Sequence, residues 1–164
     1  MPSIRNRAIA VCFGVGVTSS LAVLGAPSAG AAPVAPCQAP GASSSSVPGD
    51  DSSCSATSVG GSAAAAYGLG ADATADAGPQ SLALAIAQGG GVAASESQNL
   101  SGPAAIAVGP GAVVSAEGVR PGLSIGIAGP GATVAIDGVT RPTCSGGFGF
   151  AGDFQTLQGC LSMG

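Results

Sequence analysis

The sequence predicts an all-β protein: a short β-solenoid or β-roll of about four 20-residue repeats with a disulfide-closed C-terminal cap. Two observations predict this fold. The triplet Gly-x-Gly recurs at intervals of 21, 20 and 20 residues, beginning at Gly68, Gly89, Gly109 and Gly129. Each triplet lies between stretches in which small or apolar residues alternate with period two, as β-strands do. Self-similar strands at a fixed period near twenty favour stacked coils.

Individual strands are expected on both sides of each triplet. SLALAIA, PAAIAV and GLSIGIA precede a triplet, whereas AVVSA and ATVAI follow one. The repeat unit is therefore a strand, a Gly-x-Gly turn, a second strand and a Gly or Pro corner, and each unit buries its apolar row by stacking on the next. Alanine suits a narrow interior because burying it costs no side-chain entropy.

The repeats do not align in one register. Matching Gly109 with Gly129 sets Val114 against Val134, yet Ile125 and Ile127 then fall on the opposite parity from the preceding repeat. A one-residue slip turns every side chain of a strand to the other face. Either a bulge absorbs the slip, or the strands belong to an ordinary β-sandwich or meander.

The first 62 residues are expected to lie outside the repeat domain. Residues 1–31 read as a cleaved signal peptide, because a cationic start precedes an apolar run and an Ala-x-Ala ending. No stable membrane span is then expected in the mature chain. Residues 32–62 are rich in Pro, Ser and Gly and are interpreted as a low-complexity linker. The repeat domain is assigned to residues 63–142 and the cap to residues 143–164.

Four cysteines follow the expected cleavage site, and an even number of cysteines in an exported chain predicts disulfides. They are Cys37, Cys54, Cys144 and Cys160. Three connectivities are possible, of which the local pairing needs the shortest loops. The second loop contains Phe148, Phe150 and Phe154. These aromatic residues are expected to cover the open end of the solenoid, with a partner-binding patch as the alternative.

Composition limits the possible activities. Removing residues 1–31 takes away two of the four cationic residues and no acidic one, which changes the net charge from −4 to −6. Nucleic acid is therefore not expected as a partner, since binding it requires clustered Lys and Arg. The chain has no histidine and no lysine, so the common bases for a serine or cysteine nucleophile are absent. No catalytic residue, cofactor or metal is expected.

The acidic residues are the remaining chemical candidates. Glu117 and Asp137 occupy equivalent places one repeat apart and would lie about 5 Å from each other on adjacent strands. The favoured interpretation is a solvated corner, in which Arg120 and Arg141 pair with them. Asp72, in a Gly-rich stretch, raises the alternative of calcium between β-roll turns, but the other repeats lack this aspartate.

Residues 105–118, AIAVGPGAVVSAEG, resemble the head repeats of trimeric autotransporter adhesins, and the likeness extends over residues 66–138. The resemblance implies stacked β-coils and an adhesive role, although the period differs and no stalk follows. The whole chain is similar to small exported proteins of unknown function from mycobacteria and related actinobacteria. The shared features are the expected signal peptide, the high content of Ala and Gly, and the positions of the cysteines. That likeness implies a location and no activity.

Together these features predict a secreted, non-catalytic structural or adhesive module of the cell envelope or extracellular space. The sequence leaves two kinds of assembly open: a homo-oligomer, or association as a component of the cell envelope. The alternative is a secreted carbohydrate-active enzyme or ligand-binding protein that uses Glu96, Glu117 and Asp137. The two hypotheses differ in whether these carboxylates line a concave pocket or an exposed corner.

Overall fold

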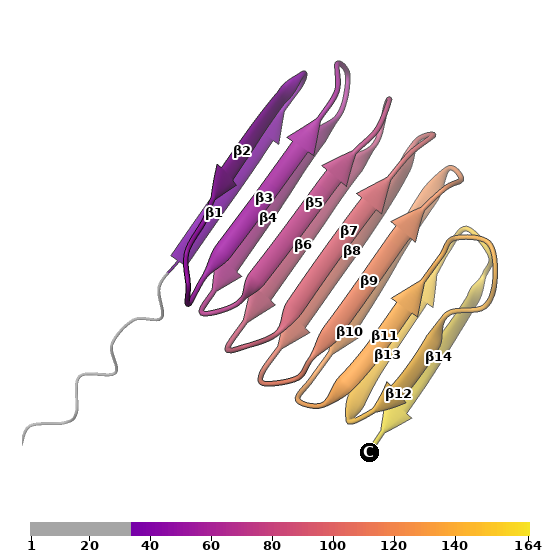
Figure 1. Ribbon diagram of the computed structural model, residues 1–164. Coiled ribbons are helices and arrows are strands. Elements are labelled where there is room, and N and C mark those ends of the chain that lie inside the picture. Colours follow the sequence, from indigo (N-terminus) through magenta and orange to yellow (C-terminus); the bar gives the residue numbers. More distant parts are fainter. Residues whose placement is uncertain (1–33) are drawn as a thin grey trace, which may run out of the picture. The chain divides into compact units, whose positions relative to one another are not determined.

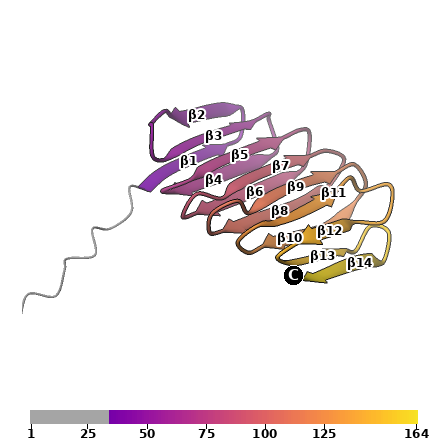
Figure 2. The same ribbon diagram turned by 60° about the horizontal axis from the view of Figure 1, so that its bottom comes forward.

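The computed structural model describes residues 34–164, which form fourteen strands and no helix. The expected signal peptide, residues 1–31, lies outside the described residues. The strands build two seven-stranded sheets, sheet A (β1-β4-β6-β8-β10-β13-β14) and sheet B (β12-β11-β9-β7-β5-β3-β2), which lie face to face (Figures 1 and 2). The strands are β1 Val34–Pro40, β2 Ser43–Val47, β3 Ser53–Ser58, β4 Ala63–Leu69, β5 Asp72–Ala77, β6 Leu82–Gln88, β7 Val92–Ser97, β8 Ser101–Val108, β9 Val113–Gly118, β10 Gly122–Ala128, β11 Ala132–Ile136, β12 Thr143–Gly146, β13 Phe148–Asp153 and β14 Gln158–Met163.

The middle of the chain is a β-solenoid of four coils. Each coil places one strand in sheet B and the next in sheet A, in the pairs β3-β4, β5-β6, β7-β8 and β9-β10, and β11 begins a further coil. Strands of successive coils pair in parallel and in register. The solenoid prediction is confirmed. The sandwich or meander alternative is wrong, because each of these strands pairs with the strand one coil away rather than with its neighbour in sequence.

Alanine fills the narrow space between the two sheets. The alternate inward positions of the coil strands are almost all alanine or serine and are buried. The alanines of β4 to β8 at these positions are Ala64, Ala66, Ala73, Ala75, Ala77, Ala83, Ala85, Ala87, Ala93, Ala105 and Ala107. The Cα atoms of Cys37 in sheet A and Cys54 in sheet B are 5.8 Å apart, compared with about 10 Å between ordinary stacked sheets. Only small side chains fit between backbones this close.

Larger interior residues appear near the C-terminal end, and glycine compensates for them. Val114, Val134 and Ile136 on sheet B are buried. A Cβ added to Gly126, on the facing sheet A, would lie 2.8 Å from Val114 Cγ1 and 3.2 Å from Val134 Cγ1. Contacts below 3.0 Å do not occur between real Cβ atoms and their neighbours. The thickness of the interior therefore stays nearly constant, because a larger side chain on one sheet faces a missing one on the other.

Each coil turns at two corners, and each of the two corners has similar residues from coil to coil. At one corner a buried serine closes the turn: Ser62 Oγ donates to Val59 O at 2.6 Å and Ser81 Oγ donates to Gly78 O at 2.7 Å. At the other corner the backbone adopts positive φ in every coil, which glycine allows without a steric penalty. One such glycine per coil is Gly70, Gly90, Gly111 or Gly131, with φ of 61°, 83°, 71° and 68°, and Gly89 and Gly109 at the same corners also have positive φ. The recurring Gly-x-Gly thus marks a turn.

The register slip noted in the sequence is absorbed at a corner. Strand partners on sheet A are 20 residues apart between β6 and β8 but 21 apart between β8 and β10, so Ile106 pairs with Ile127. Three residues, 89–91, connect β6 to β7, whereas four residues, 109–112, connect β8 to β9. The extra residue lies in the turn, so every strand keeps its inward face and no bulge is needed.

Antiparallel strands and one disulfide close each end of the solenoid. At the N-terminal end β1 pairs with β4 and β2 with β3, and Cys37–Cys54 joins β1 to β3. At the C-terminal end β12, β13 and β14 form the cap, and Cys144–Cys160 joins β12 to β14. The expected linker over residues 32–62 is wrong where it is described, because residues 34–58 form three strands. Alternating small residues there extend both sheets despite the low apolar content.

We expect the substitution Ala85→Leu to lower the free energy of unfolding by about 1 to 3 kcal/mol, because three additional carbons must enter a fully packed layer. Ala94→Leu, the same change at an outward position of β7 in sheet B, should change it by less than about 0.5 kcal/mol. Urea unfolding measures both. Equal effects would show that the interior is loose enough to accept leucine.

Each disulfide should stabilise its own end of the solenoid. The loops close over 17 and 16 residues, for which the chain-entropy model gives about 3 kcal/mol each. We expect the double variant C37A/C54A to lose amide protection mainly in β1 to β3, and C144A/C160A mainly in β12 to β14. Hydrogen exchange checks the location. Uniform loss of protection along the solenoid in either variant would contradict this assignment.

Candidate functional site

The outer surfaces of the two sheets differ sharply in chemistry. The seven strands of sheet A contain one charged residue, Asp153, and its side chain is buried. The outward positions of sheet B carry Asp72, Asp76, Glu96 and Glu117. We call the outward residues of sheet A the apolar face and the residues Asp76, Glu96 and Glu117 the acidic row. These two surfaces are the candidate functional sites.

The apolar face is a continuous row of large side chains across the whole sheet. Strand pairing aligns one outward residue from every strand of sheet A, and all seven are apolar or aromatic. In sheet order they are Pro36, Tyr67, Ile86, Ile106, Ile127, Phe150 and Leu161. Further large residues flank this row, among them Leu82 and Leu123, which are 61% and 63% exposed. A large solvent-facing apolar surface of this kind marks an interaction site.

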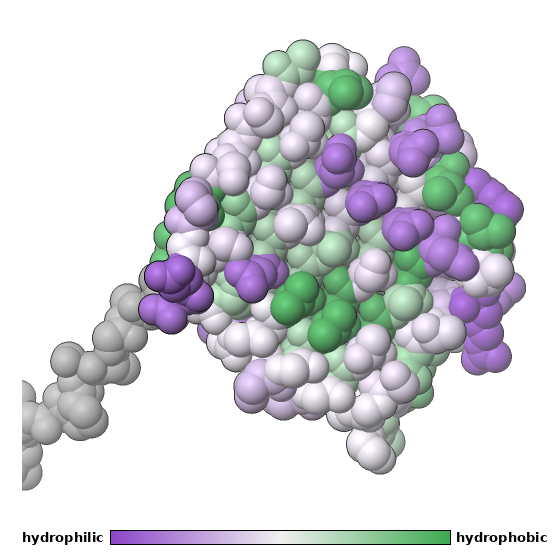
Figure 3. Space-filling view, viewed as in Figure 1, coloured by the Kyte–Doolittle hydropathy of each residue, from purple (hydrophilic) through white to green (hydrophobic). Residues whose placement is uncertain are grey.

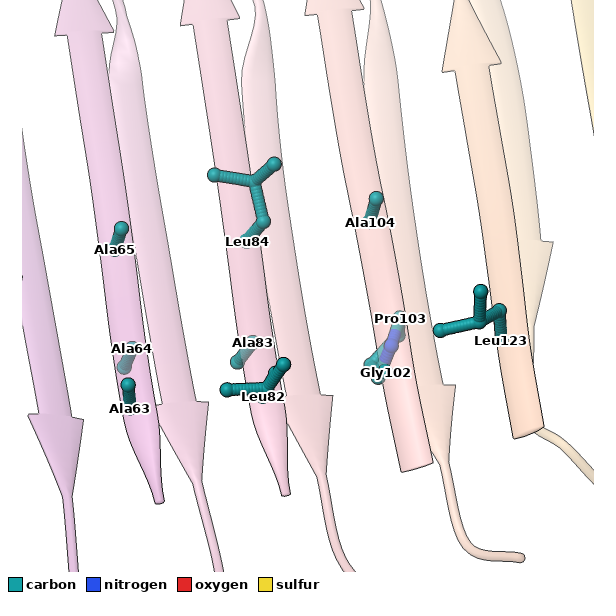
Figure 4. Close-up of a pocket in the computed structure, with 10 residues that line it drawn as sticks. All are labelled: Ala63, Ala64, Ala65, Leu82, Ala83, Leu84, Gly102, Pro103, Ala104 and Leu123. Atoms are coloured by element: carbon teal, nitrogen blue, oxygen red, sulfur yellow. The ribbon is translucent and has the colours of Figure 1, made fainter. Parts of the chain in front are cut away.

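A shallow apolar groove of about 320 Å³ crosses one half of this face. Its outward side chains alternate in size from strand to strand, as Figure 4 shows. β4 contributes Ala63 and Ala65, β6 Leu82 and Leu84, β8 Gly102 and Ala104, and β10 Leu123. The exposed Leu123 side chain extends over Gly102, and its Cδ2 lies 2.7 Å from the place of a Cβ on that glycine. The surface therefore has ridges on β6 and β10 and hollows on β4 and β8.

The aromatic residues of the cap belong to this surface. Phe148 and Phe150 point outward from β13 and are 53% and 40% exposed, and Phe154 is also exposed. The expectation that they cover the open end of the solenoid is wrong. The interior between the sheets is too thin for an aromatic ring, so Gly149 and Ala151 occupy the inward positions and the rings lie outside. Their exposed position agrees with the alternative hypothesis, in which these phenylalanines form an apolar surface patch.

The acidic row runs across the outer face of sheet B. Asp76 pairs with Glu96, and Glu96 pairs with Glu117, on adjacent parallel strands. Their backbones are therefore separated by about 4.8 Å per step, and all three side chains are exposed. Figure 3 shows hydrophilic residues crossing this side of the molecule as a diagonal band. The row is solvated, and Asp76 and Glu96 line two shallow hollows of about 150 and 200 Å³.

Asp137 does not complete this row as an open carboxylate. Its position matches that of Glu117 one coil earlier, as expected, but it lies just past the end of β11. Its Oδ2 accepts a hydrogen bond from Thr140 Oγ1 at 2.6 Å, and its Oδ1 accepts from the N–H groups of Thr140 and Val139 at 2.7 and 2.9 Å. These bonds, led by that of the Thr140 side chain, lower the pKa of Asp137. They stabilise the turn above the ordinary aspartate pKa and are lost as pH falls through the lowered value.

The expected corner ion pairs do not form within residues 34–164. Arg141 Nε donates to the carbonyl of Gly159 at 3.2 Å, which ties the corner after β11 to β14. The backbone N–H of Arg120 donates to Gln155 Oε1 at 3.0 Å. Asp137 already satisfies its oxygens within its own turn. At Asp137, the Thr140 hydroxyl and two backbone N–H groups of the same turn thus take the place expected for an arginine.

Asp72 and Asp153 are the two remaining acidic side chains of the strands, and only Asp72 was a candidate from the sequence. Asp72 Oδ1 accepts from Ser53 Oγ at 2.5 Å on the neighbouring coil, and no group of three or more potential metal ligands lies together in residues 34–164. Sequence reasoning missed the buried Asp153, whose oxygens accept from Gln155 N at 2.9 Å and Thr156 Oγ1 at 2.7 Å. These bonds cap the turn between β13 and β14. The pattern D-x-Q-T, residues 153–156, was the sequence feature that could have predicted this capped turn.

The like charges of the acidic row should cost stability. Because Glu96 has a carboxylate on each side, we expect Glu96→Gln to raise the free energy of unfolding by about 0.2 to 1 kcal/mol. The gain should shrink as salt rises. Glu117→Gln, with one neighbour of this kind within the strands, should gain less. Thermal unfolding at low and high ionic strength measures this order, and a destabilised Glu96→Gln would instead reveal a favourable partner for that carboxylate.

The comparisons with known proteins gave one match, to a protein family. Residues 2–163 match the family model described as "Family of unknown function (DUF6764)". No curated protein and no solved structure matches the chain. Within the described residues, no helix is long and apolar enough to cross a membrane. Since the match covers nearly the whole sequence, the chain belongs to this family of unknown function.

Proposed function

We propose that the protein is a non-catalytic structural or adhesive module that acts in the cell envelope or extracellular space and associates through its apolar face. The observation that carries the proposal is the seven-strand apolar row with no charged outward residue beside it. Isolated surface leucines are ordinary, but a contiguous sheet of them exposed to water requires an occupant.

The two disulfides support the proposed location. Each joins sheet A to sheet B at one end of the solenoid. Such bonds form and persist in oxidising surroundings, including the extracellular space. The signal-like composition of residues 1–31 agrees with that location. Secretion is therefore part of the proposal.

The arrangement of carboxylates favours a structural role over the alternative of a carbohydrate-active enzyme. Glu96 and Glu117 are exposed on a flat surface, and the carboxylate of Asp137 is held by its own turn. Glycoside hydrolysis requires two carboxyl groups on opposite sides of a bound sugar. The single tyrosine, Tyr67, lies on the other sheet and accepts a hydrogen bond from Gln38 at 2.7 Å. No aromatic platform therefore accompanies the acids in the described residues.

A photocrosslinking experiment in the organism that produces the chain tests this function. A photoreactive phenylalanine analogue replaces Leu82 on the apolar face, and in a matched variant it replaces Val92, an exposed valine on sheet B. We expect a crosslinked product from position 82 in the envelope or secreted fraction, and little product from position 92. Equal crosslinking from both positions, or a product confined to the cytoplasm, would contradict the proposal.

A further inference from the structure

We propose that the occupant of the apolar face is a second copy of this chain, packed sheet A against sheet A as a two-fold dimer. This inference rests on the proposed function and names the partner at the same surface. The two-fold axis lies between the two copies, parallel to the strands and midway between β6 and β8. The strands of both copies therefore run in the same direction.

The size of the face meets the lower limit for a stable dimer. With this axis six of the seven strands overlap, and six strands at about 4.8 Å spacing with about 7 residues at 3.3 Å give roughly 660 Å² of flat surface per copy. Two copies bury about 1,300 Å², just above the size at which specific interfaces begin. Side-chain relief adds to this figure. The apolar character is that of obligate dimers, whose interfaces resemble a divided core.

Within the groove, the relief of the face is complementary to itself under this symmetry, whereas the long row places Ile86 over Ile106. The axis places β6 of one copy over β8 of the other, so the ridge of Leu84 faces the hollow of Ala104. It also places β10 over β4, so Leu123 faces the hollow formed by the alanines of β4. An isologous interface requires such self-complementarity, because each patch must fit its own copy.

Charge favours this mode of pairing over others. The outward positions of sheet A are uncharged, whereas the acidic row lies on sheet B. Two negatively charged copies that stack through sheet A keep their acidic surfaces on opposite sides of the dimer. A basic partner would find its complement on sheet B instead, and an anionic lipid surface would find no cation on the apolar face.

Edge pairing is a weaker route to association. Sheet A begins at β1, which carries Pro36 and Pro40. Proline lacks an N–H group and so interrupts the pairing of an additional strand. Sheet B ends at β2 and at the four-residue β12, and short edges pair poorly. The six-residue β14 at the other end of sheet A has neither device and is the one edge left open to pairing. Face-to-face packing uses the larger free surface.

Sedimentation equilibrium of the full chain, recovered from an exporting host with its disulfides formed, tests the dimer. Over about 1 to 100 µM we expect the wild-type chain to be dimeric. Leu82→Glu should raise the dissociation constant at least about 100-fold, since each dimer would bury two uncompensated charges. Val92→Glu, the matched change on sheet B, should leave it unchanged. Thermal unfolding shows whether both variants are folded.

A crosslinking pair checks the geometry separately. Ala104 at the centre of sheet A and Ala94 at the centre of sheet B both point outward and are half-buried. Each is replaced separately, by Ala104→Cys or by Ala94→Cys. A short bismaleimide should join two copies through position 104 and not through position 94. A monomeric wild-type chain, or dimers joined through position 94, would overturn the inference.

The two proposals fail in distinguishable ways. In the photocrosslinking experiment, a product of twice the chain mass at position 82 supports the dimer. A product with any other molecule at that position keeps the proposed function and overturns the dimer. A product of twice the chain mass from position 82 that is confined to the cytoplasm would leave the dimer in place and overturn the proposed function.

Discussion

The close approach of two β-sheets across a layer of alanine is the constraint on which the rest of the structure depends. Parallel, in-register coils align equivalent residues in rows, so one small inward residue must be repeated in every coil. Where alanine faces alanine, the interior has no room for leucine or phenylalanine, and Val114, Val134 and Ile136 are accommodated beside Gly126 of the facing sheet. The leucine and phenylalanine side chains of sheet A therefore lie outside, and their exposure follows from the thinness of the core. In this protein the usual relation of size to burial is reversed along β6, where Ala83 and Ala85 are inside and Leu82 and Leu84 outside.

The same constraint explains why both ends carry disulfides. An alanine layer buries little apolar area per residue, so hydrophobic stabilisation is modest at about 25 cal/mol per Å². In the middle of the solenoid each coil gains two neighbours, whereas the terminal coils have one. Cys37–Cys54 and Cys144–Cys160 each connect the two sheets where neighbours are missing. Backbone pairing and crosslinks thus supply stability that a larger core supplies in other folds.

The solenoid and its disulfides could be predicted because they depend on period, alternation and an even cysteine count. The register of β10 could not, because aligning Gly109 with Gly129 assumed equal corner lengths, and the turn over residues 109–112 contains one more residue. The strands within residues 34–58 were missed because serine and proline carry a loop signal, although backbone pairing alone extends the sheets there. The apolar face was missed because alternation was interpreted as apolar inside and polar outside. In SLALAIA both sets of alternate positions are apolar, a pattern typical of strands covered on both faces.

The central claim is that alanine separates the two sheets and that the large side chains of sheet A face away from sheet B. Methyl NOE spectroscopy of the folded chain measures this directly. The account predicts NOEs between interior alanine methyl groups of the two sheets, for example from Ala85, and none from the methyl groups of Leu82 and Leu84 to sheet B of the same copy. Leucine NOEs to sheet B within one copy, with Ala85 facing solvent, would contradict it.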